Sequence, residues 1–344
     1  MPNAKRIFVI ADLKSHAPST LRYQVRMLLK GLTRLGHDVQ CFSYPNVALQ
    51  YSPFRKKKWA LKYGKKKTDR TLAEQIKLYD PDLIVVAILK YLDHETLQQV
   101  RQVAPNTPII GHDEDAMPGS SKKRLLLGAQ TDVMLSTGAG PFLQDYKDAG
   151  VSRVAFLPNM CDPDLQFRYP ADKRFAADII FSGKVTHGSL GGAGDREKIL
   201  QRLSQMPNCR TYGAFGTEWV NGLDYFRAIS NARIGLSTNY INDVPMYHSD
   251  RLINYLACGT FVLARRVPDT ERLFNDKVHL RYFDTEDEFF ELADWYLSHD
   301  DEREQIAAAG MAYAHAEYNC QRICGYLLDL AEGRDIDTPW KVIL

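Results

Sequence analysis

The feature that most constrains the fold is an alternation of short apolar runs with longer amphipathic segments. Residues 7–11 (IFVIA) and 83–89 (LIVVAIL) are continuous apolar runs, which is typical of strands buried on both faces. Residues 20–35 place leucines and valines at helical spacing and are followed by Gly36, a residue that favours helix termination. The alternation predicts parallel strands joined by right-handed crossovers, so the expected fold class is α/β and Rossmann-like.

The same pattern recurs in the second half, where residues 178–181, 233–237 and 261–264 are predicted strands. A chain of 344 residues fits two domains, and the polar, proline-containing residues 158–175 are typical of a linker. We therefore predict two Rossmann-like domains, residues 1–160 and 161–320, with residues 321–344 returning to the first. Parallel sheets bind ligands beyond the carboxyl ends of their strands, so we expect a site in the cleft between the domains.

Composition indicates an ordinary soluble globular protein. The chain is 45% apolar and 25% charged with a net charge of +2, so its overall field does not attract a polyanion. No apolar run approaches the ~18 residues of a membrane span, and the six scattered cysteines form no CxxC pair. We expect a cytoplasmic, reducing location, and one basic segment leaves peripheral attachment to a membrane open.

Residues 249–264 (SDRLINYLACGTFVLA) are predicted to form a helix, a glycine turn and a buried strand. Ser249 can cap the helix, whose N-terminus offers main-chain N–H groups and partial positive charge that suit a pyrophosphate. Arg251 adds a fixed cation in the first turn, and Gly259 permits the tight turn. The alternative is an ordinary Rossmann helix with a solvated arginine.

This stretch resembles the C-terminal signature of group 1 glycosyltransferases, in particular the CgeB-like (spore-maturation protein CgeB-type) branch. Residues 225–237 (YFRAISNARIGLS) and 297–318 (LSHDDEREQIAAAGMAYAHAEY) extend the resemblance over residues 178–330. It implies the GT-B architecture and transfer of a hexosyl or pentosyl group from a nucleotide diphosphate sugar to a hydroxyl acceptor. It also implies a donor site in the C-terminal domain, no metal, and no cofactor other than the donor substrate.

Two glutamates of the family pattern are replaced in this chain. In relatives one of them binds the donor ribose, and here Asn254 stands at that position; Met246 stands eight residues upstream, where the wider group has the other. An amide can still exchange hydrogen bonds with a ribose, but it carries no charge. The replacements leave the donor and the choice between retention and inversion open.

A glycine-rich segment, residues 180–196 (IFSGKVTHGSLGGAGDR), is the second predicted part of the donor site. The resemblance implies that it faces the donor phosphates, where its cations would stabilise a leaving diphosphate. His187 is a lesser candidate, and a solvated loop is the alternative because the glycines match no phosphate-binding motif. Residues 240–250 (YINDVPMYHSD) would line the donor sugar. The predicted donor-binding residues are Gly183, Lys184, Arg196, Tyr247, His248, Ser249, Arg251 and Asn254.

In the N-terminal half, the predicted strand at residues 108–111 ends at a histidine and three acidic residues (HDED). CgeB-like proteins similarly carry an aspartate-containing segment here. In an inverting reaction one of these groups would be the general base that deprotonates the acceptor hydroxyl; in a retaining reaction they would position the acceptor. A metal site is the alternative, but the spacing lacks a His/Cys framework. The predicted catalytic residues are Asp113, Asp115 and His112, with Asp12 after the first strand.

Residues 54–70 (FRKKKWALKYGKKKTDR) form the one strong charge run, and residues 55–67 contain eight lysines and arginines and no acid. The pattern fits an anionic membrane or a phosphorylated lipid-linked acceptor, a nucleic acid with stacked bases, or a solvated loop. GT-B enzymes bind acceptors on this domain, which favours an acceptor role, and residues 121–124 (SKKR) extend the surface. The predicted contacts are Lys56, Lys57, Lys58, Trp59, Tyr63, Lys65, Lys66 and Lys67.

Several functions stay open on these residues. The first is sugar transfer to a glycan or a lipid-linked envelope acceptor, and the second is transfer to a hydroxylated base in DNA. An epimerase or phosphorylase on the same fold would have no use for the basic segment. A non-catalytic protein that binds polyanions through a degenerate GT-B fold is the remaining alternative, which the replaced glutamates favour.

Overall fold

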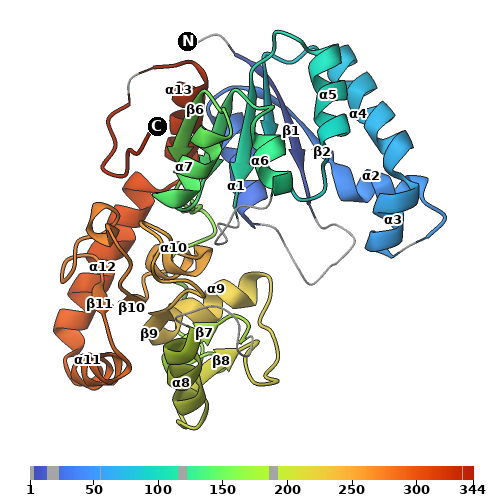
Figure 1. The fold of residues 1–344 in the computed structure, drawn as a ribbon. Coiled ribbons are helices and arrows are strands. Elements are labelled where there is room, and N and C mark those ends of the chain that lie inside the picture. The colour runs from blue at the N-terminus through green and yellow to red at the C-terminus, as the bar shows by residue number, and fades with distance from the viewer. Residues whose placement is uncertain (1–3, 14–22, 55, 115–121, 186–192, 335) are drawn as a thin grey trace. The chain divides into compact units, whose positions relative to one another are not determined.

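The computed structural model describes residues 4–13, 23–54, 56–114, 122–185, 193–334 and 336–344. The chain divides into unit 1, Met1–Pro158 with Cys320–Leu344, and unit 2, Asn159–Asn319. Each unit is built on one parallel sheet with helices between its strands (Figure 1). The predicted α/β fold class with two Rossmann-like sheets is confirmed.

Unit 1 contains a six-stranded sheet in the order β2-β1-β3-β4-β5-β6, with every pair parallel. Its strands are β1 (Arg6–Ala11), β2 (Asp38–Ser43), β3 (Leu83–Val86), β4 (Ile109–Asp113), β5 (Val133–Ser136) and β6 (Arg153–Phe156). The order reverses between β1 and β3, and such a switch point is where open α/β sheets bind ligands.

The helices of unit 1 connect these strands. They are α1 (Tyr23–Arg34), α2 (Tyr44–Tyr51), α3 (Lys57–Tyr63), α4 (Lys65–Tyr79), α5 (His94–Val103), α6 (Lys122–Gly128), α7 (Pro141–Asp148) and α13 (Cys320–Ala331). The basic segment is thus helical over most of its length, which differs from the solvated-loop alternative. Residues 87–89 continue the apolar run of β3 but lie outside the strand, because they form the loop beyond its carboxyl end.

The C-terminal residues complete unit 1. Helix α13 packs on α1 so closely that a Cβ on Gly31 would lie 2.4 Å from the main-chain oxygen of Cys320. Beyond α13, the main chain of Val342 and Leu344 exchanges hydrogen bonds with Val154 and Phe156 of the edge strand β6. This pairing covers the edge of the sheet, which would otherwise present unpaired main-chain groups.

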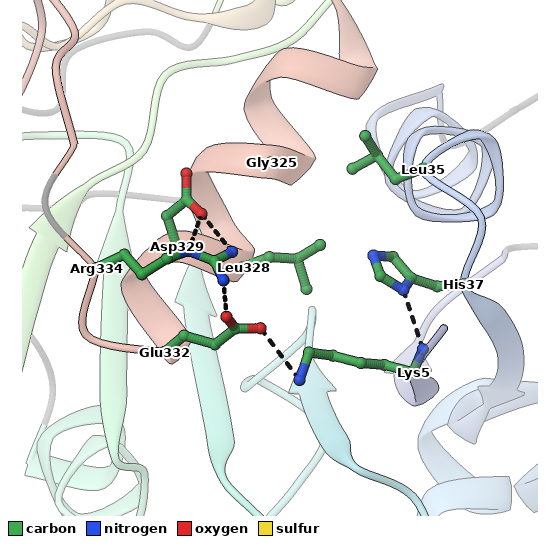
Figure 2. Close-up of a pocket in the computed structure, with 8 residues that line it drawn as sticks. All are labelled: Lys5, Leu35, His37, Gly325, Leu328, Asp329, Glu332 and Arg334. Carbon is green, nitrogen blue, oxygen red and sulfur yellow. Dashed lines mark hydrogen bonds and ion pairs between the residues drawn. The ribbon is translucent and has the colours of Figure 1, made fainter. Parts of the chain in front are cut away.

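A cavity of ≈ 330 Å³ lies where α13 meets the amino ends of β1 and β2 (Figure 2). Lys5 Nζ forms an ion pair with Glu332 at 3.1 Å, and the Lys5 main-chain N–H donates to His37 Nδ1 at 3.1 Å. Arg334 pairs with both Asp329 and Glu332. The cavity is at the amino edge of the sheet, opposite to the edge where a switch point binds ligands.

Unit 2 contains a five-stranded parallel sheet in the order β11-β10-β9-β7-β8. Its strands are β7 (Ala177–Ser182), β8 (Cys209–Tyr212), β9 (Ala232–Ser237), β10 (Phe261–Arg265) and β11 (Arg281–Phe283). Its helices are α8 (Ala193–Ser204), α9 (Leu223–Ser230), α10 (Asp250–Ala257), the 3₁₀ turn η1 (Thr270–Arg272), α11 (Glu286–Ser298) and α12 (Asp300–Glu317). The switch point of this sheet lies between β7 and β9.

The core of unit 2 explains its strand pattern. Phe181, Ile234 and Leu263 from three neighbouring strands are completely buried beside Phe289 of α11 and Ala307 of α12. Burial on both faces requires continuous apolar runs of this kind. Within the described ranges, every helix is too short or too polar to span a lipid bilayer.

Candidate functional site

Arg251 joins the two strands that flank the switch point of unit 2. Its Nε donates to the main-chain oxygen of Ser182 at the end of β7, at 2.7 Å, and its Nη1 donates to that of Thr238 just after β9, at 3.0 Å. The side chain lies in the first turn of α10 and is only 7% exposed. A guanidinium is thereby fixed where parallel sheets bind ligands, beside a helix N-terminus with its partial positive charge.

The predicted cap of α10 has a different role in the structure. Ser249 occupies the N-cap position, but its side chain makes no capping hydrogen bond. Its Oγ instead accepts from Arg251 Nη1 at 3.0 Å. The hydroxyl therefore orients the arginine, and the first N–H groups of α10 are not consumed by this side chain.

A second buried guanidinium lies beside the first. Arg196 in α8 is 4% exposed and donates from Nη2 to the main-chain oxygen of Lys184 at 2.7 Å. The guanidinium carbons of Arg196 and Arg251 lie 5.2 and 4.5 Å from the ring centre of Phe181. Burial, followed by the charge of Arg251, lowers the pKa of Arg196 to about 10. Two like charges thus lie against the same aromatic ring with their solvation largely removed.

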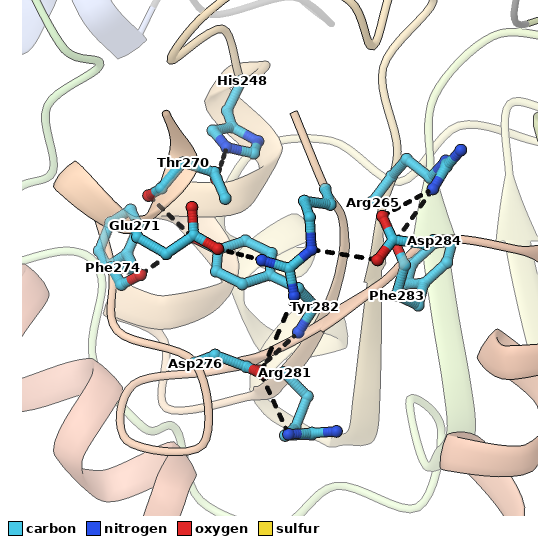
Figure 3. A network of polar contacts seen from close by, with 11 residues as sticks. His248, Arg265, Thr270, Glu271, Phe274, Asp276, Arg281, Tyr282, Phe283 and Asp284 are labelled. Carbon is cyan, nitrogen blue, oxygen red and sulfur yellow. Dashed lines mark hydrogen bonds and ion pairs between the residues drawn. The ribbon is translucent and has the colours of Figure 1, made fainter. Parts of the chain in front are cut away.

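Neither guanidinium has a carboxylate within ion-pair distance among the described residues. Their hydrogen-bond partners are main-chain oxygens and the Ser249 hydroxyl. Buried charges in proteins are normally paired, and other arginines of unit 2 do form ion pairs. Arg266 pairs with Glu271 and Asp284, and Arg281 pairs with Asp276 (Figure 3). The uncompensated pair is therefore suited to an anion that carries more than one negative charge.

Gly183 makes the approach of Arg251 possible. A Cβ at this position would lie 2.6 Å from Arg251 Nη2 and 2.9 Å from the Phe181 ring. The side chain of Lys184 is exposed, while its main-chain oxygen accepts from Arg196 and from the Tyr240 hydroxyl. The predicted donor residues Gly183, Lys184 and Arg196 thus lie together with Arg251. Tyr240 belongs to the same group, although the sequence reasoning did not single it out.

The loop before α10 is held by buried polar contacts. Asn239 accepts from the main-chain N–H of Ser249 at 3.0 Å and donates to the main-chain oxygen of Tyr247 at 3.1 Å. His248 Nε2 lies 2.9 Å from the Thr270 hydroxyl oxygen, which ties the loop to η1 (Figure 3). Burial lowers the pKa of His248 to about 3, so the imidazole is neutral. His248 therefore positions the loop and supplies no charge to a ligand.

Asn254 stands where the resemblance predicts a glutamate, and its amide is engaged inside unit 2. Its Oδ1 accepts from Gln166 Nε2 at 2.6 Å, and its Nδ2 donates to the Tyr225 hydroxyl at 3.4 Å. The residue is buried. Each of these hydrogen bonds uses only one of the two donors or two lone pairs of the amide, so one N–H and one lone pair are not used by them. Met246, at the other replaced position, is buried and has a φ of 58°.

In unit 1, the predicted base Asp113 lies at the end of β4 and is buried. Both of its carboxylate oxygens accept from Arg124 Nη1, at 2.9 and 3.1 Å, and Oδ2 also accepts from the Tyr146 hydroxyl at 2.8 Å. An ion-paired and hydrogen-bonded carboxylate is a poor proton acceptor. The carboxylate of Asp113 is therefore held by contacts within unit 1, and Arg124, which was predicted to extend the basic surface, uses its guanidinium in this ion pair.

The other predicted catalytic residues lie around the same edge of the sheet. Asp12 follows β1 and is completely buried, and His112 is half-buried. Asp115 lies outside the described residues. A narrow pocket here is lined by Ile88, Leu89, Lys90, His112, Asp113, Glu114 and Arg124. Polar groups thus meet at the carboxyl ends of β3 and β4, next to the switch point of unit 1.

Known proteins resemble the chain in sequence over part of its length and in structure over nearly all of it. The sequence model of a family described as glycosyl transferase-like matches residues 196–329. HepE from Anabaena, solved with UDP and glucose, is similar over 96% of this chain and 99% of its own, with a TM-score of 0.62 and 12% identity. The fold is GT-B.

Two other solved structures are similar to the chain over nearly its whole length. Sucrose-phosphate synthase from Thermosynechococcus elongatus matches over 96% of this chain and 98% of its own, with a TM-score of 0.65 and 14% identity. A glycosyltransferase from Rickettsia africae matches over the same shares, with a TM-score of 0.60 and 11% identity. No curated protein sequence matches the chain.

The family match covers the part of the chain that contains the buried arginines. It begins at Arg196 and includes Arg251 and Asn254, so it contains both buried guanidiniums. It agrees with the expected resemblance to group 1 glycosyltransferases, whereas the CgeB-like branch stays a prediction. Residues 1–195 lie outside the match, and so do the basic segment and the unit 1 acids.

Proposed function

We propose that this protein transfers a sugar from a nucleotide diphosphate sugar to a hydroxyl acceptor. The observation that carries the proposal is the pair of buried guanidiniums, Arg196 and Arg251, which have no carboxylate partner in the described chain. A diphosphate supplies two adjacent anionic groups that match them. The structural neighbour HepE has been solved with UDP and with UDP-glucose.

The chemistry follows from where charge develops. When the bond from the sugar to the diphosphate breaks, negative charge grows on the leaving phosphate oxygens. Fixed cations in a site of low dielectric stabilise that charge without reorganisation. Arg251, the N-terminus of α10 and Arg196 would supply this stabilisation, so we propose that the reaction needs no metal. Lys184, exposed at the end of β7, would add a mobile cation.

The acceptor is proposed to bind unit 1. Its hydroxyl must lose a proton, and polar groups at the carboxyl ends of β1 and β4 are suited to this step. Because Asp113 is paired with Arg124, we propose that Asp113 orients the site and that His112, Asp115 or Asp12 accepts the proton. The predicted acceptor is a glycan or lipid-linked molecule, with a hydroxylated DNA base as the alternative.

A nucleotide-sugar screen by thermal shift and calorimetry tests the proposal. UDP, GDP, ADP and TDP sugars would be compared with the wild type, Arg251→Gln, Arg196→Gln and the control Arg227→Gln. Arg227 is also in unit 2, but it is partly exposed and paired with Asp224. We expect at least one donor to bind the wild type and the control, and about a hundredfold weaker binding to either buried-arginine variant. If no nucleotide sugar binds the wild type, the proposal fails.

Turnover separates the alternatives. Donor consumption that requires an added hydroxyl acceptor supports transfer, whereas consumption without one, to an isomerised sugar, indicates an epimerase. If the protein binds polyanions but neither binds nor consumes any nucleotide sugar, the non-catalytic alternative is indicated. Activity that persists in EDTA would support the proposed independence from metal ions.

A further inference from the structure

We propose that α3 and Phe54, which precedes it in the chain, dock on an anionic lipid bilayer. The docking surface consists of an aromatic group, Phe54, Trp59 and Tyr63, and of the exposed lysines around it, Lys56, Lys58, Lys62, Lys66 and Lys67. Docking itself does not depend on the proposed transfer reaction, whereas a lipid-linked acceptor rests on it.

The three aromatic side chains form one exposed group. The ring centres of Phe54 and Tyr63 lie 5.1 Å apart, those of Phe54 and Trp59 6.0 Å, and those of Trp59 and Tyr63 5.9 Å. Phe54 is 46% exposed, Trp59 43% and Tyr63 50%. Large apolar side chains that gather at the surface usually mark a contact with a partner or a membrane.

The fold presents this group rigidly. Trp59 and Tyr63 are four residues apart and share one face of α3, while Ala60, on another face, is completely buried. At the end of α3, a Cβ on Gly64 would lie 2.3 Å from the main-chain oxygen of Ala48, so the turn into α4 is pressed against α2. Figure 1 shows α3 on the outer side of α2, away from the sheet. The aromatic face therefore points away from the contacts that fix the helix.

The charge around the aromatic group has one sign. The sequence contains no Asp or Glu from residue 39 to residue 68. Lys62 Nζ lies 5.7 Å from the ring centre of Trp59 and 5.4 Å from that of Tyr63, so a cation lies directly on the aromatic group. Lysines attract anionic headgroups, while tryptophan and tyrosine favour the zone between headgroups and acyl chains.

The arrangement of the rings favours a bilayer over a nucleic acid. Bases stack on open aromatic faces. Here Trp59 and Tyr63 are stacked at 21° to each other, and Lys62 lies over both. Because these ring faces already contact each other and Lys62, they are less available for stacking with bases. The group is better suited to insertion between lipid headgroups, and we call it the wedge.

The docking surface projects from the functional edge of the unit 1 sheet. Helix α2 begins directly after β2, and Lys65 at the start of α4 pairs at 3.0 Å with Asp93, the N-cap of α5. Helix α5 follows the carboxyl end of β3 in the chain, so this is the edge that carries Asp12 and His112. Under the proposed function, docking would bring this edge to hydroxyl groups carried by lipids.

Vesicle flotation of the full-length protein is the first test. We expect binding to vesicles of phosphatidylcholine mixed with phosphatidylglycerol, no binding to phosphatidylcholine alone, and weaker binding as salt rises. The double variant W59A/Y63A should bind about tenfold more weakly, and Lys66→Gln and Lys67→Gln about fivefold each. The control Trp295→Ala removes a similarly exposed tryptophan from α11 of unit 2 and should bind like the wild type.

Fluorescence quenching by lipids brominated on their acyl chains tests insertion of the wedge. The wild type should be quenched, whereas Trp59→Phe should keep its binding, because an aromatic ring remains, but lose most of the quenching. Equal quenching in both proteins would overturn the wedge. Trp59→Phe preserves the ring packing, so its result does not depend on the folding of the double variant.

Fluorescence anisotropy with single-stranded and duplex DNA completes the design. Flotation with anionic lipid and no DNA binding supports the proposal; DNA binding without flotation, or binding to neither, overturns it. Nucleotide-sugar binding is measured on the same samples. Flotation without nucleotide-sugar binding would support docking and contradict the proposed transfer. Nucleotide-sugar binding without flotation would contradict docking and leave the proposed transfer supported.

Discussion

The guanidinium carbon of Arg196 lies 3.9 Å from the centre of the Tyr240 ring. The Tyr240 hydroxyl and Arg196 Nη2 donate to the same acceptor, the main-chain oxygen of Lys184, at 2.8 and 2.7 Å. Tyr240 therefore supports the buried cation through its ring and through a shared hydrogen-bond partner, although it was not among the predicted donor-binding residues.

Tyr240→Ala should weaken the binding of UDP or the preferred nucleotide about tenfold or more, because a desolvated cation–π contact is worth ~2 kcal/mol. Tyr240→Phe keeps the ring and loses one hydrogen bond, so about a threefold loss is expected. Isothermal titration calorimetry on both variants measures the difference. Equal losses would assign the effect to the hydroxyl and contradict a role for the ring.

Removal of Arg124 should destabilise unit 1. Arg124→Met leaves the buried carboxylate of Asp113 with the Tyr146 hydroxyl but without its cation, and the free energy of unfolding should fall by about 3 kcal/mol. Hydrogen exchange of the β4 and β5 amides reports on unit 1 separately. The double variant R124M/D113N should recover part of the loss, because no buried charge remains. If it recovers nothing, the ion pair is not the cause.

His248 should make stability depend on pH. The pKa of His248 is lowered to about 3 by burial, while an unfolded histidine titrates near 6.5. Below pH ~6.5 the unfolded chain binds a proton at His248 that the folded chain does not. The free energy of unfolding is therefore unaffected by His248 above pH ~6.5 and falls progressively as pH decreases toward ~3. Between pH ~7 and pH ~5 the loss is about 2 kcal/mol. His248→Gln should flatten this part of the profile in urea titrations; an unchanged slope would contradict the assignment.

Lys65 should behave differently from the lysines beside it. Its Nζ forms ion pairs with Asp69 at 2.5 Å and Asp93 at 3.0 Å. Burial alone would lower its pKa, but the hydrogen bonds to these two carboxylates outweigh burial and raise it. Lys65→Met should cost ~3 kcal/mol of stability because Asp69 is buried.

The matched controls are Lys66→Met and Lys67→Met, both at exposed positions of the same helix. Each should change stability by less than ~0.5 kcal/mol while weakening attachment to vesicles. Thermal unfolding and flotation on the three variants separate the two roles. A similar stability for all three would contradict the stabilising role of the Lys65 ion pairs.

The fold could be predicted because burial leaves a local trace in the sequence. Residues 7–11 and 83–86 are completely or almost completely buried, so each strand is a continuous apolar run. The helices of residues 54–79 were harder to predict. Ala60, Leu72 and Ile76 face the interior, but the many charged residues between them conceal their helical spacing.

The candidate site was predictable where a motif covers it. Arg251 was found through the helix and turn around it, but its acceptors lie 69 and 13 residues away in the chain. The pairing of Asp113 with Arg124 was missed because side-chain partners across a loop follow no fixed spacing. A general base was the natural expectation for an aspartate after a strand, and only the contacts show that Arg124 and Tyr146 already hold its carboxylate.

The partners that hold Arg251 to the sheet are main-chain oxygens. A saturation library should therefore tolerate other small residues at Ser182 and Thr238, since every amino acid supplies the same carbonyl group. Gly183 and Arg251 themselves should accept almost no replacement. Sequence variation among relatives at the first two positions would then carry little information about which donor each protein uses.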